Sequence, residues 1–85
     1  MSILTRDIIN NPHKYIGKVV DAVGRVSGFP DDYVELEAGI DCALYHNDNL
    51  KMGQKVILRG TVQQGMFYKP LIKNCVVLKK YPVRF

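Results

Sequence analysis

Residues 17–26, GKVVDAVGRV, decide the fold, because small and apolar residues occupy every second position around a glycine. Val20, Ala22, Gly24 and Val26 therefore share one face of a long strand. A glycine in mid-strand is typical of a sheet that bends sharply or that another backbone crosses closely. The same spacing returns at residues 54–62, QKVILRGTV, where Gly60 takes the equivalent place. Two bent strands of this kind indicate a small closed β-barrel.

The alternation of apolar and polar residues predicts five strands, at residues 18–28, 33–37, 40–45, 55–63 and 71–79. The second and third form an antiparallel hairpin around a tight turn at residues 38–39. In the last strand Ile72, Cys75 and Val77 cannot share a face without a bulge, which we place at Asn74. A short helix capped by Thr5 and ended by Pro12 precedes the first strand.

Length and composition predict one small domain. The 85 residues divide into a short helical lid over 1–16, a barrel over 17–79 and a basic tail over 80–85. The sequence has no signal-peptide pattern and no apolar run that could span a bilayer, so we expect a cytoplasmic protein. Cys42 and Cys75 fall within apolar strand patterns, which predicts reduced, buried thiols.

Charge is distributed unevenly along the chain. Residues 1–48 carry four Lys and Arg against eight Asp and Glu, whereas residues 49–85 carry eight Lys and Arg and no acid. A strongly basic half of this kind indicates an anionic partner, although it does not identify one.

Several short motifs accompany this strand pattern. They are Asn11, Tyr15 with Gly17-Lys18-Val19-Val20, Val23-Gly24-Arg25-Val26, Asp41-Cys42, Leu50-Lys51-Met52-Gly53-Gln54-Lys55-Val56, Arg59-Gly60-Thr61-Val62 and Lys73-Asn74-Cys75-Val76-Val77. With them the chain resembles the small bacterial and phage-type OB-fold domains of the tRNA-anticodon-binding-like family. The resemblance implies an all-β, five-stranded Greek-key OB-fold barrel with a short N-terminal helix. OB-fold domains bind single-stranded DNA, RNA, sugars, peptides or proteins, so the resemblance does not select a ligand.

The resemblance also implies where a single strand would bind. OB-fold domains hold it on the outer face of the second and third strands, where aromatic rings stack on bases and cations follow the phosphates. The stacking candidates here are Phe29, Tyr33, Tyr45, Phe67 and Tyr68, and the basic candidates are Arg25, Arg59, Lys69 and Lys73. The alternative interpretation is that Tyr15 and one of Phe67 or Tyr68 fill the barrel ends.

Carboxylates oppose this placement. Glu35, Glu37 and Asp41 share the outer face of the hairpin, and Asp31 and Asp32 lie at its start, where they would repel phosphates. The nucleic acid could instead follow the first, fourth and fifth strands. Alternatively, the acidic hairpin face (Glu35, Glu37, Asp41) or the basic C-terminal half docks onto a protein or onto a second copy. Both hypotheses stay open, as does the choice between monomer and homodimer.

Catalytic motifs are not evident. Ser27, His13 and His46 form no recognisable nucleophile arrangement, and nothing resembles a phosphate loop or a redox cysteine pair. A metal site would need Cys42, His46, Cys75 and His13 to converge, which their spacing does not favour. We therefore expect a non-catalytic binding module without a metal or cofactor.

Overall fold

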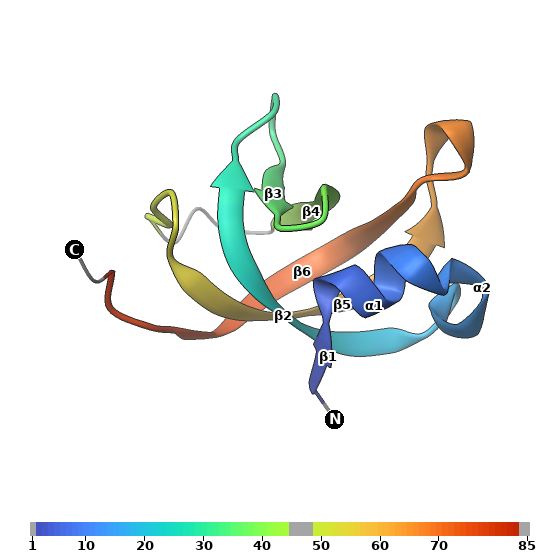
Figure 1. Ribbon diagram of the computed structural model, residues 1–85, viewed down its shortest axis with the longest axis horizontal. Helices are drawn as coiled ribbons and strands as arrows, with labels where there is room; N and C mark the ends of the chain where they lie inside the picture. Colours follow the sequence, from blue (N-terminus) through green and yellow to red (C-terminus); the bar gives the residue numbers. More distant parts are fainter. Residues whose placement is uncertain (1, 45–48, 84–85) are drawn as a thin grey trace.

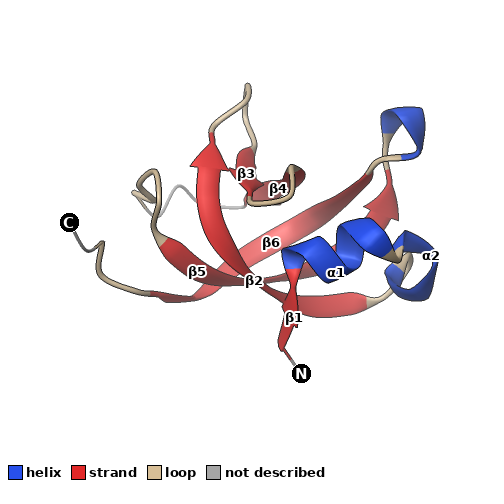
Figure 2. Ribbon diagram, viewed as in Figure 1, coloured by secondary structure: helices blue, strands red, loops and turns tan. Residues whose placement is uncertain are grey.

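The computed structural model describes residues 2–44 and 49–83 and shows a β-barrel with two short α-helices and one 3₁₀ turn (Figures 1 and 2). The barrel strands are β2 (Val19–Gly28), β3 (Val34–Leu36), β4 (Ile40–Leu44), β5 (Lys55–Gln64) and β6 (Pro70–Lys80). They follow the order β2-β3-β4-β6-β5, and β5 pairs back onto β2 to close the barrel. β4 and β6 are parallel, and the other neighbouring barrel strands are antiparallel. This arrangement confirms the predicted five-stranded Greek-key OB-fold barrel.

The core comes from the predicted alternation. Val20, Ala22 and Val26 of β2 are buried, and so are Val56, Leu58 and Val62 of β5. Burial of these apolar faces is the main driving force for closing so small a barrel. Val34, Leu36, Ile40 and Cys42 complete the core from the hairpin.

The two mid-strand glycines lie where other atoms approach the backbone closely. A Cβ added at Gly60 would lie 2.5 Å from Cγ2 of Ile72 and 2.8 Å from the carbonyl oxygen of Lys73. A Cβ added at Gly24 would lie 2.8 Å from Oγ1 of Thr5. Both contacts confirm that these strands need glycine for close approach.

The predicted bulge in β6 is also present. Thr61 pairs with Lys73 and Arg59 with Val76, so β6 uses one residue more than β5 between these two pairs. Asn74 lies in this interval with a φ of 56°, in the left-handed region that asparagine tolerates better than most residues.

The N-terminal segment differs in detail from the prediction. A short strand, β1 (Ser2–Leu4), pairs in parallel with β2, and two helices follow, α1 (Thr5–Asn10) and α2 (Pro12–Tyr15). Thr5 does not cap α1, because its Oγ1 donates a hydrogen bond to the carbonyl oxygen of Glu37 at 2.8 Å. Pro12 begins α2, a first-turn position that suits proline because it needs no backbone N–H donor. Ile8 of α1 is fully buried and joins the barrel core.

No helix within the described ranges is both long enough and apolar enough to span a membrane.

Candidate binding surfaces

The strand register aligns the outward residues of β2, β5 and β6 in rows across one wall of the barrel. Arg25 stands opposite Lys55, and the N–H of Tyr81 donates to the carbonyl oxygen of Lys55 at 2.9 Å. The following rows pair Ile57 with Lys79, Arg59 with Val76, and Thr61 with Lys73. Directly paired residues of antiparallel strands share one face. We call this surface the basic wall and define it by Arg25, Lys55, Arg59, Lys73, Lys79 and Tyr81.

Tyr81 is the aromatic centre of the basic wall. The ammonium nitrogens of Lys55 and Lys79 lie 4.9 Å and 4.7 Å from the centroid of its ring, within the range of cation–π attraction. A hollow of about 230 Å³ is lined by Arg25, Lys55, Tyr81 and Pro82. The backbone of Tyr81 is held on both sides, because its carbonyl oxygen accepts a hydrogen bond from Nε2 of Gln54 at 3.0 Å. The main chain at Tyr81 is therefore fixed beside the start of β5.

Sequence reasoning missed Tyr81 because it assigned residues 80–85 to a basic tail. The signal that could have identified it is an aromatic residue directly after two lysines at the end of a predicted strand. Such interleaving of cations and aromatics is typical of surfaces that bind nucleic acids.

The positive charge of Arg59 is partly neutralised by an ion pair with Asp21. Its Nε lies 2.7 Å from Oδ1 of Asp21 and its Nη2 lies 3.1 Å from Oδ2, so the pair is bidentate. The hydrogen bond from Arg59 holds the pKa of Asp21 below its ordinary value, and Asp21 in turn raises the pKa of Arg59. The pair joins β2 to β5 and lowers the positive charge near the middle of the wall.

The structure divides the predicted nucleic-acid residues among three places. Arg25, Arg59 and Lys73 lie on the basic wall, where the register brings them together with Lys55, Lys79 and Tyr81. Phe67 and Lys69 lie in or beside the short helix η1 (Met66–Tyr68), in the loop that joins β5 to β6. Phe29 and Tyr33 lie in the β2–β3 loop. Tyr45 and the side chain of Tyr68 lie outside the described part of the chain.

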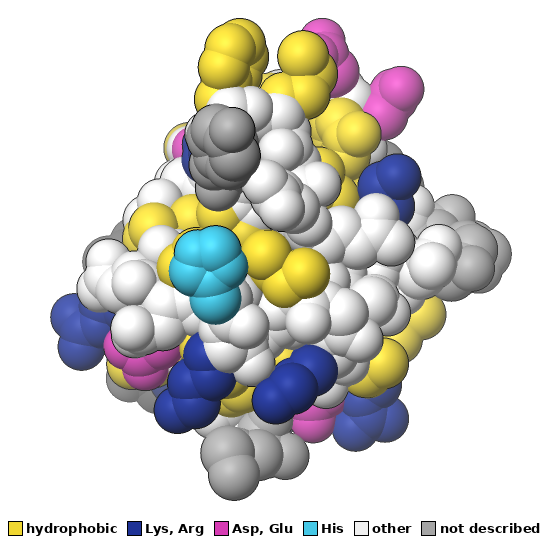
Figure 3. Space-filling model, turned by 90° about the vertical axis from the view of Figure 1, so that its right-hand side faces the viewer, with side chains coloured by type: hydrophobic (Ala, Val, Ile, Leu, Met, Phe, Trp, Pro, Cys, Tyr) yellow, Lys and Arg dark blue, Asp and Glu magenta, His cyan; other side chains and the backbone are white. Residues whose placement is uncertain are grey.

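The β5–β6 loop displays two apolar side chains. Phe67 is 90% exposed and Met66 is 80% exposed. Of the two residues that the alternative interpretation offered for this barrel end, Phe67 or Tyr68, Phe67 is therefore not the one that fills it. Figure 3 shows hydrophobic side chains standing out at the top of the molecule, with acidic side chains beside them, and most of the visible Lys and Arg side chains in the lower half. The loop is closed by a hydrogen bond from the N–H of Gly65 to the carbonyl oxygen of Lys69 at 2.8 Å. Figure 1 shows this loop and the C-terminal end of β6 at opposite ends of the β5–β6 ribbon.

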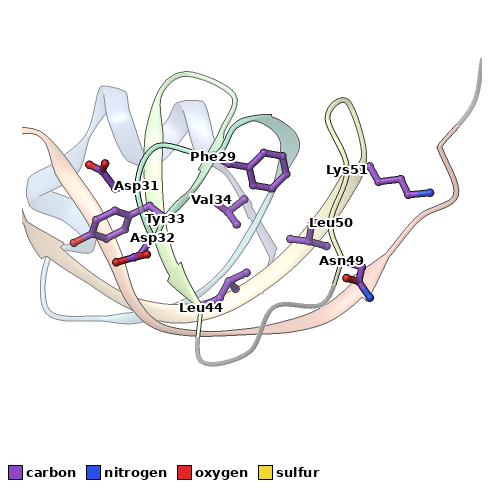
Figure 4. A pocket seen from close by; sticks show the side chains of 9 residues that line it. All are labelled: Phe29, Asp31, Asp32, Tyr33, Val34, Leu44, Asn49, Leu50 and Lys51. Carbon is purple, nitrogen blue, oxygen red and sulfur yellow. The ribbon is translucent and has the colours of Figure 1, made fainter.

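The β2–β3 loop forms part of a groove of about 620 Å³ (Figure 4). Its apolar floor consists of Val34, Leu44 and Leu50, and its rim includes Phe29 and Tyr33. Asp31 and Asp32 also line the groove. The two predicted stacking residues of this loop thus share their surroundings with carboxylates.

The hairpin face is acidic, as predicted. Glu35 stands directly opposite Asp41, and Oδ1 of Asp41 is buried with no hydrogen-bond partner among residues 2–44 and 49–83. Oε1 of Glu35 accepts a hydrogen bond from Oγ of Ser27 at 2.9 Å, and Oε1 of Glu37 accepts one from the N–H of Arg25 at 2.9 Å. Glu35 and Glu37 thus fasten the hairpin to β2, while Glu35 and Asp41 together make this face unfavourable for phosphates.

The two cysteines are buried free thiols. A hydrogen bond with Cys75, together with burial, raises the pKa of the Cys42 thiol well above its ordinary value. Sγ of Cys75 also donates to the carbonyl oxygen of Ile72 at 3.3 Å. In the described ranges, no three His, Cys, Asp or Glu side chains gather closely enough to hold a metal ion.

Comparison with known proteins gives no family assignment: no protein-family model matches the chain, and a search of curated proteins finds no match.

Proposed function

We propose that this chain is a non-catalytic, cytoplasmic OB-fold module that binds single-stranded nucleic acid with low sequence specificity along the basic wall. The observation that carries the proposal is the Tyr81 ring, with Lys55 and Lys79 over it and Arg25 beside it in the same hollow. An aromatic face stacks on any base, and nearby cations neutralise the phosphates on either side of it.

The rest of the wall supplies a path for the strand. Lys79, Arg59 and Lys73 follow one another along the β5–β6 ribbon toward the loop that exposes Phe67. β5 has ten residues, so the ribbon extends roughly 30 Å. That length suits the several nucleotides that one OB-fold binds. The strand order is the one that OB-folds share in general, so it supports the fold and does not distinguish tRNA-anticodon-binding-like domains from other OB-fold domains.

The path avoids the acidic hairpin face. Repulsion by Glu35 and Asp41 disfavours the usual OB-fold position of the strand, whereas Asp21 is already paired with Arg59. Tyr81 can stack only on a base that is not enclosed in a duplex, so we expect single strands to bind more tightly than duplexes.

Fluorescence anisotropy of a labelled oligonucleotide of about 12 nucleotides, titrated at low and physiological salt, tests this proposal. We expect micromolar or tighter binding that weakens as salt rises and exceeds binding to the matching duplex. Absence of binding at low salt would overturn it.

Three variants locate the site. Tyr81→Ala should weaken binding about tenfold, since one stacked base contributes roughly 1–3 kcal/mol, and Tyr81→Phe should restore most of the loss. The double variant Lys55→Ala/Lys79→Ala should make the plot of log association constant against log salt less steep, with a slope about 1.4 closer to zero. The matched control is Lys14→Ala, whose ammonium lies over Tyr15 on α2. If the control lost as much affinity as these variants, the nucleic acid would not bind along the basic wall.

A further inference from the structure

The groove at the β2–β3 loop combines an apolar floor with one negatively charged end. Its volume of about 620 Å³ lies in the range of specific binding sites. Val34 and Leu50 are buried, Leu44 is half-buried and Phe29 is 47% exposed. Figure 4 shows Asp31 and Asp32 at one end of the groove and Lys51 at the other. The groove can therefore bury an apolar group on its floor, and its two ends carry opposite charges.

The negative end is not neutralised by the protein. Asp31 and Asp32 are adjacent and exposed, and within the described ranges neither carboxylate has an ion-pair or hydrogen-bond partner. Outside the groove, Glu35 and Asp41 stand opposite each other on the hairpin and add further negative charge to it. Two neighbouring carboxylates with no counter-charge attract a cation and repel an anion, so this end of the groove is unsuited to nucleic acid.

We propose that this groove binds a peptide segment of a partner protein that carries an arginine next to an aliphatic side chain. The aliphatic side chain covers the floor made by Val34, Leu44 and Leu50. The guanidinium group reaches Asp31 and Asp32, where its planar fork matches carboxylates, and it stacks on an aromatic ring of Phe29 or Tyr33. Lysine lacks both the fork and the flat stacking surface, so arginine binds more tightly. The proposal does not rest on nucleic-acid binding, which uses other strands.

The test is a titration of ¹⁵N-labelled protein with the peptide acetyl-Leu-Arg-Leu-amide, followed by chemical-shift changes. We expect saturable changes confined to residues 29–34, 44 and 49–51. Replacing the arginine with lysine should weaken binding several-fold, and replacing it with citrulline, which is uncharged, should weaken it at least about tenfold. Replacing both leucines with glycine should weaken it similarly, because the floor then stays uncovered.

Protein variants complete the test. Asp31→Asn/Asp32→Asn should reduce affinity at least about tenfold, and both changes are at exposed positions, so the barrel should remain folded. Asp7→Asn is the matched control, because Asp7 is an exposed acid on α1, outside the groove. Equal affinity of the double variant and the wild type, or shifts centred outside the groove, would overturn the proposal. Binding of spermidine without binding of the peptide would overturn it as well.

Discussion

At the residue scale, Gly60 and Gly24 show most directly how the sequence allows the β-barrel to close. The atoms that would meet a Cβ at Gly60 include a backbone carbonyl oxygen, which cannot turn away as a side chain can. At Gly24 the nearest atom belongs to the Thr5 side chain, which is held by its hydrogen bond to Glu37. Gly28, by contrast, has only ordinary contacts, the nearest 3.6 Å from an added Cβ.

These contacts predict a ranking of three alanine variants. Gly60→Ala should lower the free energy of unfolding by about 3 kcal/mol or more, Gly24→Ala by about 1–3 kcal/mol, and Gly28→Ala by less than about 1 kcal/mol. Urea denaturation of the three variants measures the ranking. A Gly28→Ala loss as large as that of Gly60→Ala would show that close approach at Gly60 does not explain the need for glycine.

At the element scale, the two-residue period predicted the barrel strands, and it did so most clearly for β2 and β5. β2 and β5 have ten residues each, and the apolar face of each was predicted correctly. β1 has three residues, too few for a period to show, and its pairing with β2 depends on tertiary contacts. Pro12 was predicted to end the first helix, and α1 does end at Asn10, but the sequence did not show that a second helix begins at Pro12, where the first turn accepts proline.

The candidate surfaces were less predictable than the strands. The nine predicted nucleic-acid residues include Arg25, Arg59 and Lys73 of the basic wall, but not Lys55, Lys79 or Tyr81. Arg25, Lys55 and Tyr81 become neighbours only through the pairing of β2 with β5 and of β5 with the end of β6. One-dimensional periodicity shows which face a residue occupies, whereas register decides which residue stands beside it.

The Asp21–Arg59 pair joins two elements and predicts a pH dependence. Arg59 holds the pKa of Asp21 in the folded protein below the ordinary value of 3.8. The ionised carboxylate therefore stabilises the fold above pH 3.8, and this contribution disappears as the pH falls through the lower folded pKa. Asp21→Asn should remove this contribution, so the free energy of unfolding of the variant should fall less steeply than that of the wild type as the pH is lowered.

Urea denaturation from about pH 6 to about pH 2 measures this effect. Asp7→Asn is the control, since Asp7 has no ion-pair partner among the residues that the structure describes. Identical pH profiles for Asp21→Asn and the wild type would mean that the pair does not contribute to folding.

At the scale of the whole molecule, the closed barrel turns a division of charge along the chain into a division between surfaces. β3 and β4 carry carboxylates outward, whereas the basic wall carries Arg25, Lys55, Arg59, Lys73 and Lys79 on β2, β5 and β6. Cations gathered on one wall repel one another in the folded state more than in the extended chain. The basic wall should therefore lower stability at low ionic strength.

This repulsion predicts that salt stabilises the wild type. The Debye length falls from about 30 Å at 0.01 M to about 3 Å at 1 M, so added NaCl should raise the free energy of unfolding as it screens the wall. The double variant Lys55→Ala/Lys79→Ala should start more stable at low salt and respond less to NaCl, whereas Lys14→Ala should respond as the wild type does. Denaturation by urea at several NaCl concentrations measures all three proteins. If the wild type and the double variant responded to NaCl in the same way, the cations of the basic wall would be too far apart, or too well solvated, to repel one another. The basic wall would then also attract phosphates less strongly than proposed.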